Sequence, residues 1–193
     1  MKTIANFLTT VVMVLCFSAC ESCEDPYAQF EYTLVCSEQL LEYATPEVTY
    51  TNDKGEEITT ILTDNLWEKG YGFADISTYS TGGDNSERMH WNSPKIKYDD
   101  FTSVDNTISV KYIPKSGIAS DSTFTSTTGL FHYLYYTINV RDDSGDNHFE
   151  TNTLTTIQNW TNINIKQNVI EYINSLSDKL TCHAKNDGTI EVK

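Results

Sequence analysis

The chain has 193 residues and a formal net charge of −14 at pH 7, because 27 Asp and Glu outnumber 13 Lys and Arg. A surface this acidic repels phosphate backbones, so nucleic acid is excluded as an expected partner. The length suits one domain with a full core, and the abundance of Thr, Asn, Ser and Tyr favours strands and turns over helices.

The N-terminus has the pattern of a secretion signal. Lys2 is followed by an apolar stretch from about Phe7 to Phe17. This stretch has the length of a signal-peptide core and is too short for a permanent membrane span. Two small residues then precede Cys20. We therefore expect residues 1–19 to be a lipoprotein signal peptide.

The segment Phe17-Ser18-Ala19-Cys20 resembles the lipobox of bacterial lipoproteins, although Phe17 stands where leucine is most common. The resemblance implies that the Cys20 thiol is diacylglycerated and that Cys20 becomes the new N-terminus. Two or three acyl chains would hold the protein stably at a membrane. A plain secretory peptide with a chance cysteine is the alternative.

Acidic residues follow the cysteine and resemble the export signal of surface-exposed Bacteroidetes lipoproteins; they are Glu21, Glu24 and Asp25. This resemblance implies an outer-membrane lipoprotein at the cell surface, with the periplasmic face as the alternative. Residues 20–27 would then be the lipidated cysteine and an acidic tether.

We expect residues 28–193 to form one β-sandwich domain. The segment "AQFEYTLVC" alternates, with Phe30, Tyr32, Leu34 and Cys36 on one face, which predicts a half-buried strand. A short irregular connection is expected next. The segment "PEVTYTNDKGEEITTILT" then predicts a hairpin with Gly55 in the left-handed position of its turn.

Residues 65–94 are rich in glycine and aromatic side chains. Aromatic residues on loops stack on sugar rings or anchor protein partners, so they are candidates for ligand contact. The alternative is that they pack against the open ends of the sandwich. The candidates are Tyr71, Phe73, Tyr79 and Trp91.

The segments "KIKYDDF" and "NTISVKYIPK" predict two further strands, and "GLFHYLYYTINVRDD" predicts a central one, because it is apolar on both faces. The following "DDSGDN" places oxygen-bearing side chains at alternate positions, as calcium loops do. It lacks the glycine position and the terminal glutamate of an EF-hand, so a polar hairpin turn is the better interpretation.

Near the C-terminus the apolar period becomes helical and predicts an amphipathic helix over about 164–180. A closing hairpin is predicted at residues 186–188. The chain is therefore expected to be mainly β: an antiparallel, immunoglobulin-like two-sheet sandwich with one C-terminal helix. The order of these segments is similar to that of small Bacteroidetes surface lipoproteins with β-sandwich domains.

Cys16 lies in the expected signal peptide, and Cys20 is assigned to lipid, so three of the five cysteines remain: Cys23, Cys36 and Cys182. An extracytoplasmic compartment permits disulfides, so Cys36 and Cys182 could form one. Two buried free thiols are the equally open alternative, since cysteine packs as a small hydrophobe.

The sequence has no catalytic motif, no histidine pair at metal-ligand spacing and no cofactor-binding loop, so neither a metal nor a cofactor is predicted. The expected function is that of a lipid-anchored extracytoplasmic binding protein without catalysis, which recognises a glycan or a protein partner. The alternatives are an accessory subunit of an envelope complex and a glycan-active enzyme with unidentified carboxylates.

Overall fold

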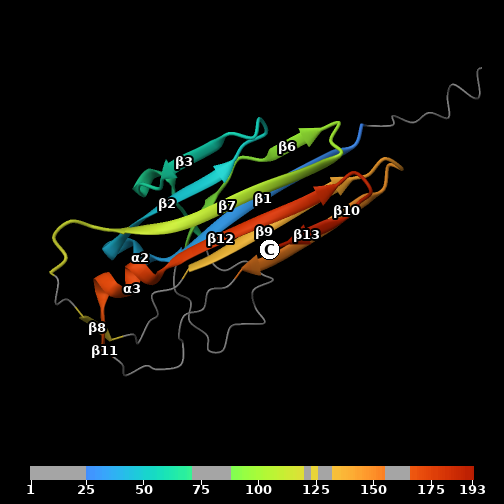
Figure 1. Cartoon of the computed structure of the whole chain (residues 1–193). Coiled ribbons are helices and arrows are strands. Elements are labelled where there is room, and N and C mark those ends of the chain that lie inside the picture. Colours follow the sequence, from blue (N-terminus) through green and yellow to red (C-terminus); the bar gives the residue numbers. More distant parts are fainter. Residues whose placement is uncertain (1–24, 71–87, 120–122, 126–131, 155–165) are drawn as a thin grey trace, which may run out of the picture.

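The computed structural model describes residues 25–70, 88–119, 123–125, 132–154 and 166–193, and it shows two antiparallel sheets packed face to face (Figure 1). The first sheet has the order β10-β9-β1-β5-β4, with β6 also paired to β1. Its strands are β1 (Tyr27–Ser37), β4 (Glu68–Gly70), β5 (Arg88–Asn92), β6 (Ile96–Asp99), β9 (His132–Arg141) and β10 (Asn147–Leu154). The second sheet has the order β13-β12-β7-β2-β3, formed by β2 (Ala44–Thr51), β3 (Glu57–Ile61), β7 (Ser103–Pro114), β12 (Ser177–Lys185) and β13 (Ile190–Val192). The predicted two-sheet sandwich is confirmed.

Short elements connect these strands. They are the helix α2 (Glu38–Tyr43), the 3-10 turn η1 (Asp64–Leu66), the helix α3 (Val169–Ser175), and the strands β8 (Thr123–Thr125) and β11 (Lys166–Asn168), which pair with each other. Both helices lie at one end of the sandwich, which we call the helical end (Figure 1). The chain enters β1 at the opposite end, which we call the tether end.

Alternating apolar side chains explain why these segments are strands. On β1, Ala28, Phe30 and Tyr32 are fully buried, whereas the residues between them are partly exposed. Buried and partly exposed residues alternate along β7 and β9 in the same way, and the predicted central position of β9 is confirmed, since it has a partner on each side. The facing residues of the two sheets form one core that includes Leu34, Ile108, Val110, Leu134, Ile138 and Val140.

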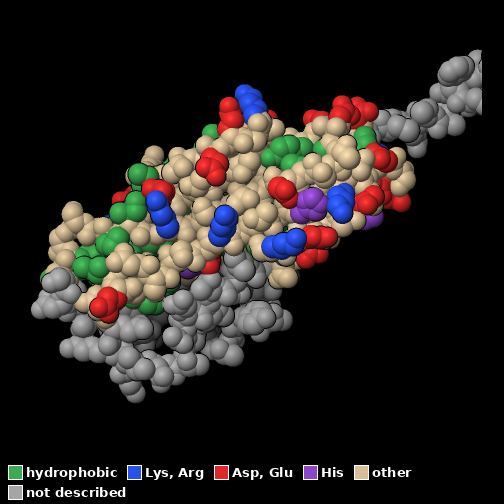
Figure 2. Space-filling view, in the orientation of Figure 1, with side chains coloured by type: hydrophobic (Ala, Val, Ile, Leu, Met, Phe, Trp, Pro, Cys, Tyr) green, Lys and Arg blue, Asp and Glu red, His purple; other side chains and the backbone are tan. Residues whose placement is uncertain are grey.

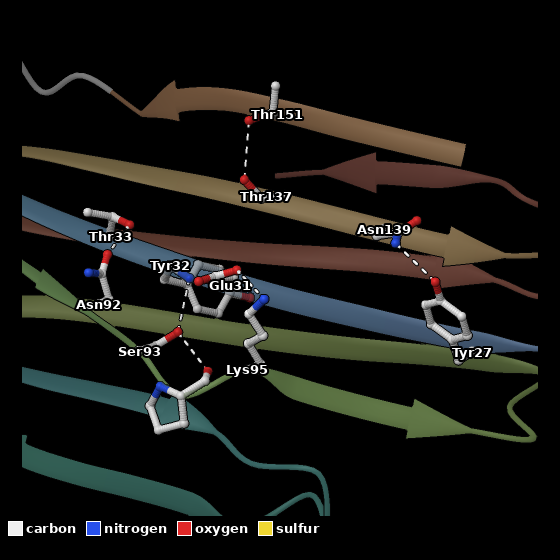
Figure 3. A network of polar contacts seen from close by, with 11 residues as sticks. Tyr27, Glu31, Tyr32, Thr33, Asn92, Ser93, Lys95, Thr137, Asn139 and Thr151 are labelled. Atoms are coloured by element: carbon white, nitrogen blue, oxygen red, sulfur yellow. Dashed lines mark hydrogen bonds and ion pairs between the residues drawn. The ribbon is translucent and has the colours of Figure 1, made fainter. Parts of the chain in front are cut away.

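The strand β1 is paired along both of its edges. β9 covers one edge, and β5 followed by β6 covers the other. At the break between β5 and β6, the Ser93 N–H donates to the Tyr32 carbonyl at 2.8 Å, and Ser93 Oγ accepts from the Tyr32 N–H at 3.0 Å (Figure 3). Pro94, which has no N–H, follows directly. The Ser93 side chain thus supplies an acceptor to β1 at the place where its partner strand is interrupted.

Polar side chains also bridge the two sheets inside the core. The Tyr32 hydroxyl on β1 donates to Asn106 Oδ1 on β7 at 2.7 Å. Asn106 Nδ2 in turn donates to the Tyr98 hydroxyl on β6 and to the Thr51 carbonyl, both at 2.9 Å. Burial raises the pKa of the Tyr32 phenol, so it stays a neutral donor.

The C-terminal helix is shorter than predicted. α3 ends at Ser175, and the predicted range of about 164–180 is wrong because β12 begins at Ser177. Leu176 and Leu180 are both buried and lie four residues apart. Two residues four positions apart lie on the same face whether the segment is a helix or a strand. The spacing of Leu176 and Leu180 therefore could not show where the helix ends and the strand begins.

The helix α2 occupies the connection after β1, where an irregular segment was expected. Ser37 caps it, since its Oγ accepts a hydrogen bond from the Leu40 N–H at 3.3 Å. Leu40 is fully buried and anchors the helix against the core. The serine before Glu38 was the signal for this helix start.

The predicted polar turn after β9 is confirmed, and one carboxylate organises it. Asp142 Oδ1 accepts from the Ser144 N–H at 2.9 Å, from the Ser144 hydroxyl at 2.7 Å and from the Asp146 N–H at 2.9 Å. Asp142 Oδ2 lies 2.7 Å from His148 Nε2. The bond with His148, and then those with Ser144, hold the pKa of the Asp142 carboxyl well below its usual range.

The closing hairpin is confirmed as well, and it docks on that turn. The Asp143 N–H donates to the Asn186 carbonyl at 3.0 Å, and Asn186 Nδ2 donates to Asp143 Oδ2 at 2.8 Å. Gly188 has a φ of +85° and lies so close to the His148 ring that an added Cβ would overlap it. One hairpin from each sheet thus closes the tether end.

The substitution Gly188→Ala should destabilise the fold more than Gly55→Ala. Both glycines have positive φ, +85° and +77°, so each alanine carries a backbone cost of about 1–2 kcal/mol. Only the Cβ at position 188 meets another group, because the space at Gly55 is open within 4 Å. In urea unfolding, the Gly188 variant should lose about 1 kcal/mol more than the Gly55 variant. Equal losses would show that the hairpins do not dock as described.

Candidate functional site

The structure describes one of the four aromatic residues that were predicted to contact a ligand, namely Trp91. Tyr71, Phe73 and Tyr79 lie outside the described residues, as does Cys20. Trp91 lies on β5, is only 8% exposed, and packs on Tyr50 with ring centroids 6.3 Å apart. The ligand-contact prediction is therefore corrected for Trp91, whose alternating position on β5 turns its ring into the core.

Of the two alternatives for Cys36 and Cys182, the structure has the two buried free thiols and not the disulfide. Cys36 Sγ lies 3.3 Å from the Tyr112 hydroxyl, whereas the Cys182 thiol lies beside the Tyr32 side chain. Tyr32 is four residues from Cys36 along β1, or roughly 13 Å of strand. The strand register therefore keeps the two sulfurs apart.

A buried histidine and aspartate join the sheets near Cys36. His132 on β9 is directly opposite Cys36, and its ring lies against Tyr112 with centroids 5.1 Å apart. His132 Nε2 lies 2.5 Å from Asp178 Oδ2 on β12, and both side chains are almost completely buried. His132 Nδ1 has no hydrogen-bond partner within the described ranges. The pair therefore connects the first sheet to the second across the core.

Cys36, His132 and Asp178 are the residue types that form the nucleophilic site of a thiol enzyme. A thiol must ionise and be reachable by substrate to react. Burial raises the pKa of Cys36 to about 12, Tyr112 is the thiol's hydrogen-bond partner, and the side chain is fully buried. This geometry supports a packing role for the cluster.

A pocket opens at the helical end, between α2 and the residues that follow β3 and β7. Its volume is about 190 Å³. Its floor is apolar, and its rim is polar. The floor consists of Leu41 from α2, Ala44 from β2, Leu62 and Trp67, and the rim consists of Thr45, Thr63, Asp64 and Lys115.

Backbone hydrogen bonds fix the walls of this pocket. The Leu62 N–H donates to the Pro46 carbonyl at 2.9 Å, and the Lys115 N–H donates to the Tyr43 carbonyl at 2.8 Å. The Trp67 indole N–H donates to the Leu62 carbonyl at 3.3 Å, so the ring is held in one orientation. Segments distant in the sequence thus meet at a defined place beside α2.

The rim carries two opposite charges. Asp64 and Lys115 are both exposed, and neither makes a side-chain ion pair within the described part of the chain. Together with the threonine hydroxyls they offer donors and acceptors above an apolar floor. Such a lining can bind a small molecule that has both apolar and hydroxyl-bearing surfaces.

Hydrophobic side chains are exposed around the pocket. Ile61 is 51% exposed, and Leu66 and Ile113 are each 39% exposed. In the space-filling view, hydrophobic groups show near α2 and α3, while acidic groups gather towards the tether end (Figure 2). Exposed hydrophobic groups are not confined to the helical end, since Phe149 on β10, 65% exposed, lies towards the tether end.

Sequence reasoning did not predict this pocket, because the residues that line it belong to no motif. Among the described residues, no group of three or more His, Cys, Asp or Glu side chains is arranged to hold a metal ion. None of the helices in the described ranges has the length and apolar character of a membrane span.

Both core thiols should resist alkylation while the protein is folded. The thiolate is the reactive form, and pKa values of about 12 for Cys36 and about 11 for Cys182 keep both protonated near neutral pH. Peptide mass spectrometry after iodoacetamide treatment should find both unmodified in buffer and both modified in urea. A disulfide would instead require a reductant before either residue reacted.

Removing Asp178 should cost far more stability than removing an exposed ion-pair partner. Asp178→Ala leaves the His132 ring buried without its carboxylate, for an expected loss of about 3–5 kcal/mol in chemical unfolding. Lys69→Ala, which removes the exposed contact with Glu38, is the control and should cost about 1 kcal/mol or less. Similar losses from the two variants would contradict a sealed inter-sheet pair.

Comparison of the chain with known protein families, with curated proteins and with solved structures finds no match in any of the three.

Proposed function

We propose that this protein is a lipid-anchored extracytoplasmic binding protein whose ligand site is the pocket at the helical end. The observation that supports this most directly is the position of the pocket. β1 begins at Tyr27, just after the tether, and ends at Ser37, beside α2. Its 11 residues span about 36 Å of extended strand. With the lipid at Cys20, the pocket would face away from the membrane.

The chemistry of the pocket supports binding more than hydrolysis. Glycoside hydrolysis uses two carboxyl groups that flank the bond to be cleaved. The described residues that line this pocket include one carboxylate, Asp64. The glycan-active enzyme alternative therefore gains no support at this position, whereas a binding site requires only the mixed lining that is present.

Attachment to a protein partner is a second candidate, and it rests on the exposed apolar residues. Ile61 and Ile113 lie on the strands on either side of β2, and β3 is the last strand of its sheet. Exposed apolar groups beside a sheet edge are typical of protein contact surfaces. An accessory subunit of an envelope complex would use this surface.

The test compares reporter cysteines at the two ends of the sandwich, in a Cys23→Ser background where Cys36 and Cys182 stay buried. Thr63→Cys reports on the pocket rim, and Lys54→Cys reports on an exposed turn at the tether end. Intact cells are treated with a bulky, membrane-impermeant maleimide. We expect Thr63→Cys to react faster than Lys54→Cys in anchored protein, since the membrane shields the tether end.

The same pair in a Cys20→Ala chain is the control. That protein should appear in the soluble fraction. There, Thr63→Cys and Lys54→Cys should react with the maleimide at rates similar to each other. Labelling of Thr63→Cys only after lysis would overturn the surface location. Retention of the Cys20→Ala protein at the membrane would overturn the lipid anchor.

A further inference from the structure

We infer that the pocket binds one uncharged pyranose ring, the terminal residue of a glycan, an inference that rests on the binding function proposed above. Its size is the first argument. A dry cavity of about 150 Å³ admits benzene, and drug-sized ligands occupy about 300–1,000 Å³. A pocket of about 190 Å³ therefore holds a single six-membered ring with its substituents. The remainder of a longer glycan would extend into solvent.

The lining matches the two surfaces of such a ring. A pyranose has C–H groups on its faces and hydroxyl groups around its edge. Leu62 and Trp67 are buried floor residues that would contact the C–H face. A purely apolar ring would leave the hydrogen-bonding groups of Asp64 and Lys115 at the rim unused, whereas the hydroxyls of a sugar can reach them.

Three rim groups are available to recognise hydroxyls. The Asp64 carboxylate can accept from two hydroxyls, the Lys115 ammonium can donate, and the Thr45 hydroxyl can do either. The Trp67 indole N–H already bonds to a carbonyl, and the Thr63 hydroxyl donates to Asn65 Oδ1 at 2.6 Å. Discrimination among sugars therefore falls on Asp64, Lys115 and Thr45.

The charge of the site favours a neutral ligand. Asp64 and Lys115 compensate each other at the rim, and the chain as a whole has a formal net charge of −14. An acidic sugar or a peptide carboxylate would gain from Lys115 but would be repelled by Asp64 and by the field of the protein. A neutral ring uses both charged groups as hydrogen-bond partners.

The experiment is saturation-transfer difference NMR on the full mature chain carrying Cys20→Ala. The neutral probes are the methyl glycosides of glucose, galactose, mannose and N-acetylglucosamine. The charged probes are the methyl glycoside of glucuronic acid and a short peptide with uncharged side chains and a free C-terminal carboxylate. At least one neutral glycoside should give ring-proton signals. Asp64→Asn and Lys115→Met should each weaken its binding by about tenfold, the loss expected for one charged hydrogen bond.

Asp53→Asn and Lys54→Met are matched controls. They change an exposed aspartate and lysine in the turn at the opposite end, and they should leave binding unchanged. A neutral glycoside signal that is equal in the pocket and control variants would place binding elsewhere and overturn the inference.

Other results separate this inference from the proposed function. If glucuronide or peptide binds, depends on Lys115 and is favoured over every neutral glycoside, the pyranose inference fails while the binding function stands. If no probe gives a signal with folded protein, both the inference and the assignment of the pocket as a ligand site are overturned.

Discussion

Buried polar side chains of one sheet bond to those of the other across the core, and these contacts constrain the position of one sheet on the other. Apolar contacts alone allow sheets to slide, because they have no preferred direction. Hydrogen bonds from Tyr32 to Asn106 and from Asn106 to Tyr98 do not allow this. The contact between His132 and Asp178 fixes a second point nearer the helical end. Two directional links at different places along the strands specify a single alignment.

With the middle of the sandwich fixed in this way, the ends acquire different properties. At the tether end, hairpins from both sheets dock through Asp143 and Asn186, and His148 covers Gly188. At the helical end, the described residues between α2 and the loop after β3 leave a depression. The side chains of Leu62 and Trp67 remain as the floor of a pocket. With the anchor at Cys20 proposed above, this pocket would lie at the end of the domain remote from the membrane.

Local patterns predicted the strands and turns, because the alternation of apolar and polar side chains and the choice of turn residues both depend on consecutive positions. The same patterns could not decide between two structures that share a spacing, as Leu176 and Leu180 show. Nor could they predict which distant residues meet. Cys182 is placed beside Tyr32 by the register of β12 on β7, and Lys115 reaches the pocket only because β7 pairs with β2. Pairing of this kind is set by the whole core and not by neighbours in sequence.

The pairing of β1 has a consequence for how the chain acquires its structure. β1 is the first strand in the sequence, yet one of its edges is covered by β9, with Cys36 opposite His132. The second sheet is equally non-local, since β7 needs β12. Conformational entropy is lost when such long loops close, before the contacts between the strands stabilise the fold. Topologies of this kind therefore fold slowly. Neither half of the chain contains all the described strands of either sheet, so both sheets are completed only when strands from the two halves pair.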